Sequence, residues 1–495
     1  MFIDKSVDQR FSSRLAMLLS TLGIAVGTGN IWRFPRIAAQ NGGDEGAGSL
    51  LIAWVVFLFL WSIPLIIAEY MLGEKYRKGV VGAFAASMGK KFAWMGSFVG
   101  FVAAAISFFY AVIVGWAMYY LLQSLFFPLP ADNTASLAIW EKFQSGYLPY
   151  LFHLTVVCLG GIAIWKGIHS IEKVSMVLIP VLLLIIIITF FRAITLPGAL
   201  EGIAFLFRPD WAQLVKPELW LQALTQNAWD TGAGWGLFLT YAAYMKKEHG
   251  TVKNAFITGI GNNTVSLLMA IIIFSTVFSV LQYGQGFSDT QVLDVMKTSG
   301  PASTGLTFIW IPQLFGAMPF GRVIAIMFFL GLCFAGFTSM ISMFELSARV
   351  FVDRGIKRSK ALWIIIPVVY LLGIPSVMNL GFLSNQDFVW GIGLIISGIF
   401  IAISITVSGI STFRKSITDE SSIYFSGWWQ NIILYFVPVA GVMLLFWWMS
   451  LAATRFAPGE WYNPFNPFSV MTCLVQWFVV IGIFILLNKK IAGNL

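Results

Sequence analysis

This 495-residue sequence has few charged residues, few cysteines and few histidines. Only 11% of its residues are Asp, Glu, Lys or Arg, whereas a soluble globular protein carries about 25%. A protein surrounded by water is therefore excluded. All three cysteines (Cys158, Cys333 and Cys473) lie in apolar runs, so a disulfide framework is not expected. The three histidines are scattered and lack the acidic partners of a membrane-embedded enzyme, so we expect no catalytic residues.

Long apolar runs are abundant instead. The sequence is 58% hydrophobic, with a mean hydropathy of +0.82. A transmembrane helix needs about 20 apolar residues, and the runs are too long for the alternating pattern of a β-barrel. The sequence therefore predicts an all-α polytopic membrane protein with 12 transmembrane helices, at 15–39, 50–74, 93–126, 149–165, 171–194, 219–245, 255–284, 321–352, 361–379, 387–410, 428–453 and 466–488.

The basic residues gather in alternate loops. The terminal segments and every second loop hold 22 of the 31 lysines and arginines. Because cytoplasmic loops are enriched in basic residues, both termini are predicted to be cytoplasmic, in a bacterial inner (plasma) membrane. We interpret the net charge of +9 as a consequence of the basic residues in cytoplasmic loops, and no nucleic-acid partner is expected. A basic surface that binds anionic lipid stays a secondary alternative, because the charges are spread over all these loops.

Two of the predicted spans are rich in glycine. The first carries Gly23, Gly27 and Gly29, and the sixth carries Gly232, Gly234 and Gly236. Each glycine costs about 1 kcal/mol relative to alanine inside a helix, so both helices are predicted to unwind at mid-membrane. Unwound backbone is tolerated there only where it lines a cavity. Close helix packing through small residues is the alternative interpretation. Breaks in first and sixth position suit a 5+5 inverted repeat followed by two appended helices.

The sequence around the first break resembles the neurotransmitter:sodium symporter family, most closely its bacterial amino-acid transporters. The resemblance covers about residues 12–410. It is carried by GIAVGTGNIWRFP (23–35) with Asn41-Gly42-Gly43, and by FYAVIVGWAMYY (109–120), TLPGALEG (195–202), TYAAY (240–244) and FAGFTS (334–339). The resemblance implies a leucine-transporter-like fold and symport of sodium with a small solute.

The resemblance also implies two Na⁺ sites. Sodium is a hard cation that takes oxygen ligands, and unwound helices offer free carbonyls. One site would comprise Ala25, Asn30, Asp230 and Asn262, with the substrate carboxylate completing it. The other would comprise Gly23, Val26, Ala335, Thr338 and Ser339. Interhelical hydrogen bonding is the alternative interpretation for the two asparagines and the two hydroxyls.

Gly27 indicates the class of substrate. Family members that carry amines without a carboxylate have an aspartate at this position. Gly27 leaves room and free amides for a carboxylate near a helix N-terminus, so an amino acid is expected, with Tyr110 also holding its carboxylate. The register of the resemblance gives a pocket lined by Ile24, Ile106, Trp229, Gly232, Ala233, Trp235, Met340 and Met343, which favours a neutral, hydrophobic side chain under a Trp229 lid. The residues expected to bind the substrate are Ala25, Gly27, Thr28, Gly29, Ile106, Tyr110, Trp229, Asp230, Gly232, Trp235, Ser339 and Met343.

Asp230 departs from the family pattern, in which a neutral serine or threonine is usual. Chloride-independent members often carry a carboxylate at the position of Ser266 instead, and the tyrosine that chloride-using members employ aligns with Trp54. We interpret Asp230 as a fixed anion beside sodium, so that chloride is not required. A protonated Asp230 that caps the broken helix is the alternative.

Charged pairs indicate two gates. Arg33 and Asp387 match the outer gate of the family, and Asp353 with Tyr244 match the inner gate. The usual inner arginine aligns with Asp8, so Arg10 or Lys5 would have to replace it. Glu69 and Glu345 are interpreted as hydrogen-bonding supports of the broken helices.

These features predict a symporter that imports neutral, hydrophobic amino acids by alternating access. Betaine- or taurine-like solutes keep an acid group and are the alternative substrates; a channel would lack paired gates. The sequence does not indicate an oligomeric state. The expected segments are an N-terminal cytoplasmic segment (1–13), a first repeat (14–194), an extracellular loop (195–218), a second repeat (219–411) and a C-terminal pair of helices (412–495). The second repeat is expected to contain an extracellular lid loop at 285–320, with helices at 289–299 and 303–315.

Overall fold

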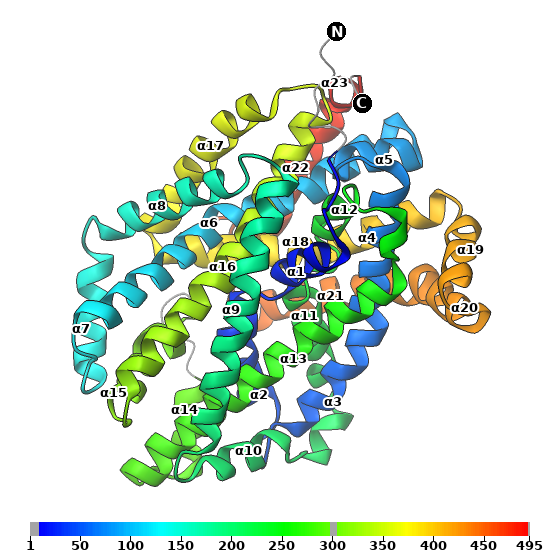
Figure 1. Ribbon diagram of the computed structural model, residues 1–495. Coiled ribbons are helices and arrows are strands. Elements are labelled where there is room, and N and C mark those ends of the chain that lie inside the picture. The colour runs from blue at the N-terminus through cyan, green and yellow to red at the C-terminus, as the bar shows by residue number, and fades with distance from the viewer. Residues whose placement is uncertain (1–8, 298–303, 494–495) are drawn as a thin grey trace.

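The computed structural model describes residues 9–297 and 304–493, and this part of the chain contains helices and no strands. Residues 1–8, 298–303 and 494–495, and Lys5 with them, lie outside the described residues. The described start of the chain and its last helix lie at one end of the molecule, and α10 and α14 lie at the other (Figure 1). This arrangement agrees with an even number of membrane crossings.

The first predicted span is interrupted where the glycines gather. Helix α1 (Arg14–Ala25) begins at Ser13, whose hydroxyl accepts a hydrogen bond from the Ala16 amide at 3.1 Å. The helix ends at Ala25, because Val26 is extended with ψ 93°. The chain then continues as η1 (Gly29–Arg33) and α2 (Phe34–Asn41), at 51° to α1.

The sixth span is interrupted in the same way. Helix α11 (Pro217–Asp230) is followed by six residues before α12 (Leu237–Ala242). In this gap Gly232, Gly234 and Gly236 have φ of +71°, +88° and +78°, which side chains on L-residues rarely allow. The fully buried Glu69 accepts hydrogen bonds from the amides of Gly234 at 2.6 Å and Leu239 at 3.1 Å. Glu69 thus replaces helical acceptors lost at the break, which confirms its expected supporting role.

The remaining apolar runs are helical, and shorter helices such as α7 and α10 lie in the segments between them. Their bounds are α3 (Gly48–Phe57), η2 (Leu58–Ser62), α4 (Ile63–Tyr76), α5 (Val80–Met88), η3 (Lys90–Phe92), α6 (Ala93–Phe126), α7 (Asn133–Gln144), α8 (Leu148–Ala163), α9 (Ile168–Ile194), α10 (Ala199–Phe207), η4 (Trp211–Val215), η5 (Lys247–His249), α13 (Val252–Val277), η6 (Phe278–Gly284), α14 (Asp289–Lys297), η8 (Leu306–Trp310), α15 (Ile311–Gly316), α16 (Gly321–Val352), α17 (Arg358–Met378), α18 (Leu380–Val407), α19 (Ile410–Glu420), α20 (Ile423–Asn431), η9 (Ile432–Phe436), α21 (Val437–Leu451), η10 (Ala452–Phe456), α22 (Val470–Leu486) and α23 (Asn488–Ala492).

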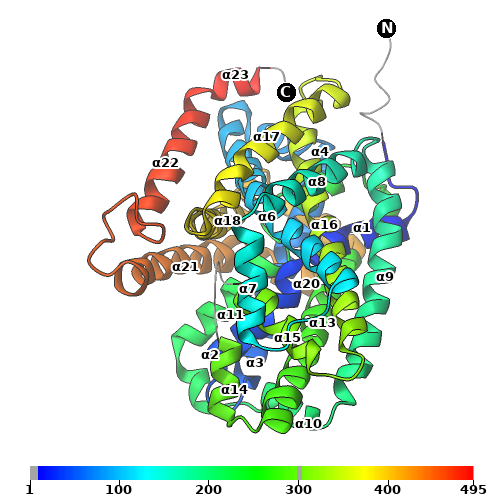
Figure 2. The same cartoon turned by 90° about the vertical axis from the view of Figure 1, so that its left-hand side faces the viewer.

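By length and composition, 8 of the described helices can cross a membrane, or up to 10 if each bent pair is one span. The broken pair α11–α12 is not among them, and α22 has only 17 residues. The all-helical membrane architecture is therefore confirmed, whereas the number of twelve stays a prediction. The last two apolar helices, α21 and α22, lie at the periphery of the bundle (Figure 2).

The segment expected to form a lid is helical on both sides of residues 298–303. Helix α14 ends at Lys297, and η8 with α15 follows. Gln40 of α2 donates to the Lys297 carbonyl at 2.8 Å, and the Lys297 ammonium pairs with Asp44 at 3.0 Å. The segment is therefore attached to the part of the first broken helix that follows the break.

Candidate functional site

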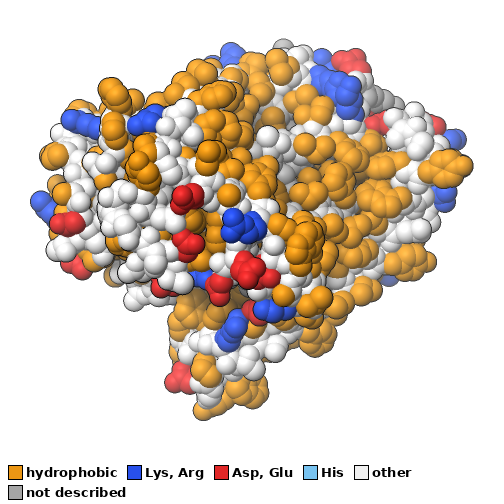
Figure 3. All heavy atoms as spheres, turned by 90° about the horizontal axis from the view of Figure 1, so that it is seen from below, with side chains coloured by type: hydrophobic (Ala, Val, Ile, Leu, Met, Phe, Trp, Pro, Cys, Tyr) orange, Lys and Arg blue, Asp and Glu red, His pale blue; other side chains and the backbone are white. Residues whose placement is uncertain are grey.

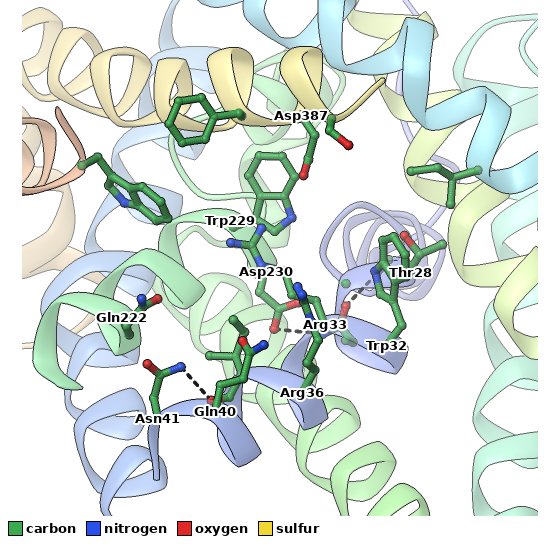
Figure 4. A pocket seen from close by; sticks show the side chains of 18 of the residues that line it. Thr28, Trp32, Arg33, Arg36, Gln40, Asn41, Gln222, Trp229, Asp230 and Asp387 are labelled. Atoms are coloured by element: carbon green, nitrogen blue, oxygen red, sulfur yellow. Dashed lines mark hydrogen bonds between the residues drawn. The ribbon is translucent and has the colours of Figure 1, made fainter. Parts of the chain in front are cut away.

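A cavity of about 720 Å³ lies between the two helix breaks. Residues from both breaks line it, together with residues of α6, α16 and α18 (Figure 4). Its lining also includes exposed side chains such as Asp44 and Arg455, so it opens at the end that carries α14. Acidic and basic side chains gather near the middle of that face, between broad hydrophobic areas (Figure 3).

Thr28 and Tyr110 form part of the wall of the cavity. The Tyr110 hydroxyl accepts hydrogen bonds from the Thr28 amide and from the Thr28 hydroxyl, both at 3.1 Å. A Cβ at Gly27 would lie 3.0 Å from the Ser339 hydroxyl oxygen and 3.1 Å from that of Tyr110. The glycine therefore keeps the backbone, Tyr110 and Ser339 close together, and any side chain at position 27 would fill the space between them.

Asp230 lies in a cluster of buried polar side chains. Its Oδ2 accepts a hydrogen bond from Ser266 at 2.9 Å, and Asn30 donates to Ser266 and to Asn262 at 2.7 Å each. The side-chain oxygen Oδ1 of Asn30 accepts from the Gly27 amide at 2.8 Å. Within the described residues, Oδ1 of Asp230 is buried and has no hydrogen-bond partner. An orphaned carboxylate oxygen beside two amide side chains fits a cation.

A second group of oxygens gathers where α1 meets α16. The Ser339 hydroxyl lies 3.1, 3.2 and 3.5 Å from the carbonyl oxygens of Gly23, Ile24 and Val26. One hydroxyl proton cannot satisfy three carbonyls, so acceptors are in excess here. Thr338 adds a hydroxyl 3.1 Å from the Ala335 carbonyl. This oxygen-rich, anion-free set suits a hard monovalent cation, and Ile24 joins the carbonyls that the sequence predicted.

Part of the remaining lining is apolar, and the charged residues of the lining include Arg33, Arg36 and Asp387. Of the predicted substrate-contacting residues, eleven line the cavity, whereas Ile106 is fully buried and does not. The face of α6 toward the cavity is instead formed by Phe109, Tyr110 and Ile113. Ile106 was implied by the register of the family resemblance, and its place four residues before Tyr110 puts it near the same face of the helix.

Arg33, Trp229 and Asp387 lie toward the open end of the cavity. The Arg33 guanidinium lies over the Trp229 ring, 4.8 Å from its centroid. Asp387 and Asp230 are the acidic groups whose charges act on Arg33. Within the described part of the chain, Arg33 and Asp387 make no ion pair with each other. The two predicted gate residues thus face one cavity while it stands open.

The opposite end is closed by a buried ion pair. Asp353 pairs with Arg349, one turn earlier, at 2.7 Å, and accepts from the Gly79 amide at 2.6 Å. Arg349 also donates to the Arg77 carbonyl at 2.9 Å and lies 4.8 Å from the Tyr244 ring centroid. Burial raises the pKa of the Asp353 carboxyl, and the Arg349 charge acts in the opposite direction.

A second network lies beside this pair. The Tyr244 hydroxyl donates to Glu345 at 2.6 Å, and the Arg358 guanidinium binds both oxygens of that carboxylate. Arg358 also donates to the Ile164 carbonyl at 3.0 Å. Glu345 therefore joins the segment after α12 to the start of α17. This role is broader than the support expected for it.

Sequence reasoning did not find Arg349 and Arg358, because it treated both as loop charges that set topology. It assigned the arginine role at the inner gate to Arg10 or Lys5. In the structure Asp353 pairs with Arg349 and accepts from the Gly79 amide, and Arg10 donates to the Gln9 carbonyl at 3.1 Å. The spacing of Arg349 and Asp353, four residues apart on one helix, was a usable signal.

Comparison with known proteins identifies the family of the chain. The sequence model of the sodium:neurotransmitter symporter family matches residues 8–145 and 147–492. An uncharacterized sodium-dependent transporter of Methanocaldococcus jannaschii is 31% identical over 454 residues, which are 88% of this chain and 90% of that protein. The uncharacterized sodium-dependent transporter YhdH of Bacillus subtilis is 27% identical over 457 residues, which are 88% of this chain and 96% of that protein.

A solved structure is also similar. The crystal structure of MhsT in complex with L-phenylalanine superposes with a TM-score of 0.76 at 26% identity, covering 88% of this chain and 99% of that one. The family match spans nearly the whole chain and the fold agrees with MhsT. The chain belongs to the sodium:neurotransmitter symporter family, and it is a sodium-dependent membrane transporter.

Proposed function

We propose that the chain imports neutral, hydrophobic amino acids together with sodium by alternating access. The observation that carries this proposal is the close approach at Gly27 of the Thr28 amide, Tyr110 and Ser339, beside a cavity whose lining also includes the apolar side chains of Ile24, Phe109 and Ile113. A carboxylate suits the hydroxyl and amide groups, and no acidic side chain stands at position 27 to receive a bare amine. MhsT, whose structure contains L-phenylalanine, supports an amino acid as substrate.

Two sodium ions are proposed as co-substrates. Asp230, Asn30, Asn262 and the Ala25 carbonyl would hold one, and its shell would be completed by the substrate carboxylate. Ser339, Thr338 and the carbonyls of Gly23, Val26 and Ala335 would hold the other. A tenfold gradient contributes about 1.4 kcal/mol per ion and 100 mV about 2.3 kcal/mol per charge. Two ions would thus supply about 7 kcal/mol, enough to concentrate a neutral solute about 10⁵-fold.

The gates follow from the two ends of the cavity. Arg33 and Asp387 would pair when the outer end closes over a solute under Trp229. Separation of Asp353 and Tyr244 from their partners would then open the inner end, with Arg10 moving together with α1. In this proposal the inner end faces the cytoplasm of a cell with an inner (plasma) membrane, and both termini lie on that side.

Asp230 is proposed as the fixed anion that makes chloride unnecessary. Its carboxylate accepts from Ser266, and the side-chain amide of Gln226, one turn earlier, is buried without a partner in the described structure. Removal of the carboxylate would leave these donors facing a vacant anion position. Asp230→Ser is therefore expected to make uptake depend on chloride, whereas uptake by the unaltered protein continues when gluconate replaces chloride. A collapse of wild-type uptake in gluconate would contradict the fixed-anion role.

Uptake into proteoliposomes tests the function as a whole. With an inward sodium gradient, a radiolabelled hydrophobic amino acid should accumulate above its external concentration, and should not do so when potassium replaces sodium. A competition panel of 20 amino acids with glycine betaine and taurine then ranks the substrates. Competition by betaine or taurine alone would replace the amino-acid proposal by the alternative, and flux that never exceeds equilibrium would contradict symport.

A further inference from the structure

The Trp229 indole spans the outer part of the cavity from one broken helix to α18. On one edge, a Cβ at Gly29 would lie 3.9 Å from its Cδ1 and 4.0 Å from its Nε1. On the other edge, a Cβ at Gly391 would lie 2.5 Å from Cζ3, 3.1 Å from Cη2 and 3.2 Å from Cε3. The six-membered ring therefore occupies the place that any side chain at position 391 would need.

The ring seated at Gly391 has neighbours that fix its orientation. Arg33 lies over its face, and Trp235 packs against it with ring centroids 5.7 Å apart at 61°. Trp235 is itself held by a hydrogen bond from its Nε1 to the Ala228 carbonyl at 3.2 Å. A small second cavity of about 80 Å³ lies next to the indole, lined in part by Gly391 and Asp387. The indole is thus a partition between two spaces.

Asp387 stands one helical turn before Gly391 on α18. Figure 4 shows its side chain beside the Trp229 indole, while the Arg33 side chain comes from the first broken helix. The guanidinium that would pair with Asp387 is instead placed against the aromatic face, where a cation–π contact compensates part of the missing ion pair.

We propose that Gly391 is a positioning residue of the outer gate. The absence of a side chain there leaves a notch in α18 that receives the Trp229 ring, and the seated ring holds Arg33 away from Asp387. When the indole leaves the notch to cover a bound solute, Arg33 loses its aromatic partner and is free to pair with Asp387. Lid and gate then close in one movement. The transport part of this inference rests on the proposed function, whereas the notch itself does not.

A double-mutant cycle tests the notch without substrate. In Gly391→Ala the new methyl group displaces the ring, so the detergent-solubilised protein is expected to unfold at a lower temperature. Trp229→Phe removes the part of the side chain that fills the notch, so the same Gly391→Ala change should lower the midpoint little in that background. Gly393→Ala is the matched control, because a Cβ there has no neighbour nearer than 3.5 Å.

The same variants test the gate through transport. Gly391→Ala should raise KM for a large hydrophobic amino acid about tenfold, because the displaced ring enters the cavity, and change KM for alanine less than about threefold. Trp229→Phe/Gly391→Ala should match Trp229→Phe, and Gly393→Ala should match the unaltered protein.

Equal effects of Gly391→Ala and Gly393→Ala would overturn the proposal, as would a loss that Trp229→Phe does not rescue. If Gly391→Ala alone yields no folded protein, the double variant decides: it folds if the ring causes the clash, and its failure while Trp229→Phe folds also overturns the notch. If the unaltered protein transports no amino acid, the proposed function fails, and the unfolding cycle still tests the notch.

Discussion

The two ends of the cavity are built from similar residues but are held differently. At the inner end, Arg349 pairs with Asp353 and Arg358 with Glu345, and both pairs are almost fully buried. At the outer end, Arg33 lies over an indole, and Asp387 is half-buried beside the open cavity. Both ends possess the charges that closure needs. The comparison therefore indicates that an end is closed when its charged residues are paired with each other and open when they are not.

The largest effect is expected from breaking the inner network at Glu345. Glu345→Gln leaves Arg358 buried without its carboxylate, which should lower the free energy of unfolding by about 3–5 kcal/mol. Thermal and denaturant unfolding of the solubilised protein measures this. Glu218→Gln is the matched control, because its partner Arg455 is exposed, and such a pair contributes about 1 kcal/mol or less. Equal losses in the two variants would show that the inner network does not hold the structure.

A smaller effect is expected at Arg349. Arg349→Lys keeps the charge beside Asp353 but loses the hydrogen bond to the Arg77 carbonyl and the broad contact with the Tyr244 ring. The loss should be about 1–3 kcal/mol, and the inner end should open more often.

A cysteine introduced at the buried Ser342, in a variant without the three native cysteines, reports this opening. It should react faster with a thiol reagent in Arg349→Lys than in the parent. Arg354→Lys, next to Asp353 but outside the pair, serves as the control. An unchanged reaction rate would remove Arg349 from the inner gate.

The smallest effect on stability is expected at the outer end. Asp387→Asn breaks no ion pair in this conformation, so the free energy of unfolding should change by less than about 1 kcal/mol. Sodium-driven uptake should nevertheless fall about tenfold or more, because the outer end can no longer close on a charge pair. A stability loss as large as that of Glu345→Gln would mean that the outer pair is already formed in the resting protein.

The fold could be predicted from the sequence because its signals are local. Apolar runs mark the helices, and clusters of glycine mark the two interruptions, which the structure places after Ala25 and after Asp230. Position in the membrane and the exact number of crossings are not local properties. They depend on neighbouring helices and lipid, and they stay predictions.

The site could be predicted only where residue type carries the chemistry. Gly27, Tyr110 and Asp230 belong to this class. The convergence of the Ile24 carbonyl on Ser339, by contrast, is a property of backbone direction, which the residue name does not encode. The contact of Trp229 with Gly391 joins residues 162 positions apart through the absence of a side chain, and no pattern in a single sequence reports such a vacancy.

The attachment of α14 to α2 has a mechanical consequence. Gln40 and Asp44 tie the half-helix that bears Arg33 to a segment on the outer surface. Any tilt of that half-helix must carry the surface segment with it or break both contacts. The resting position of an element deep in the bundle can therefore be set by contacts at the mouth of the cavity, through which a solute would have to pass.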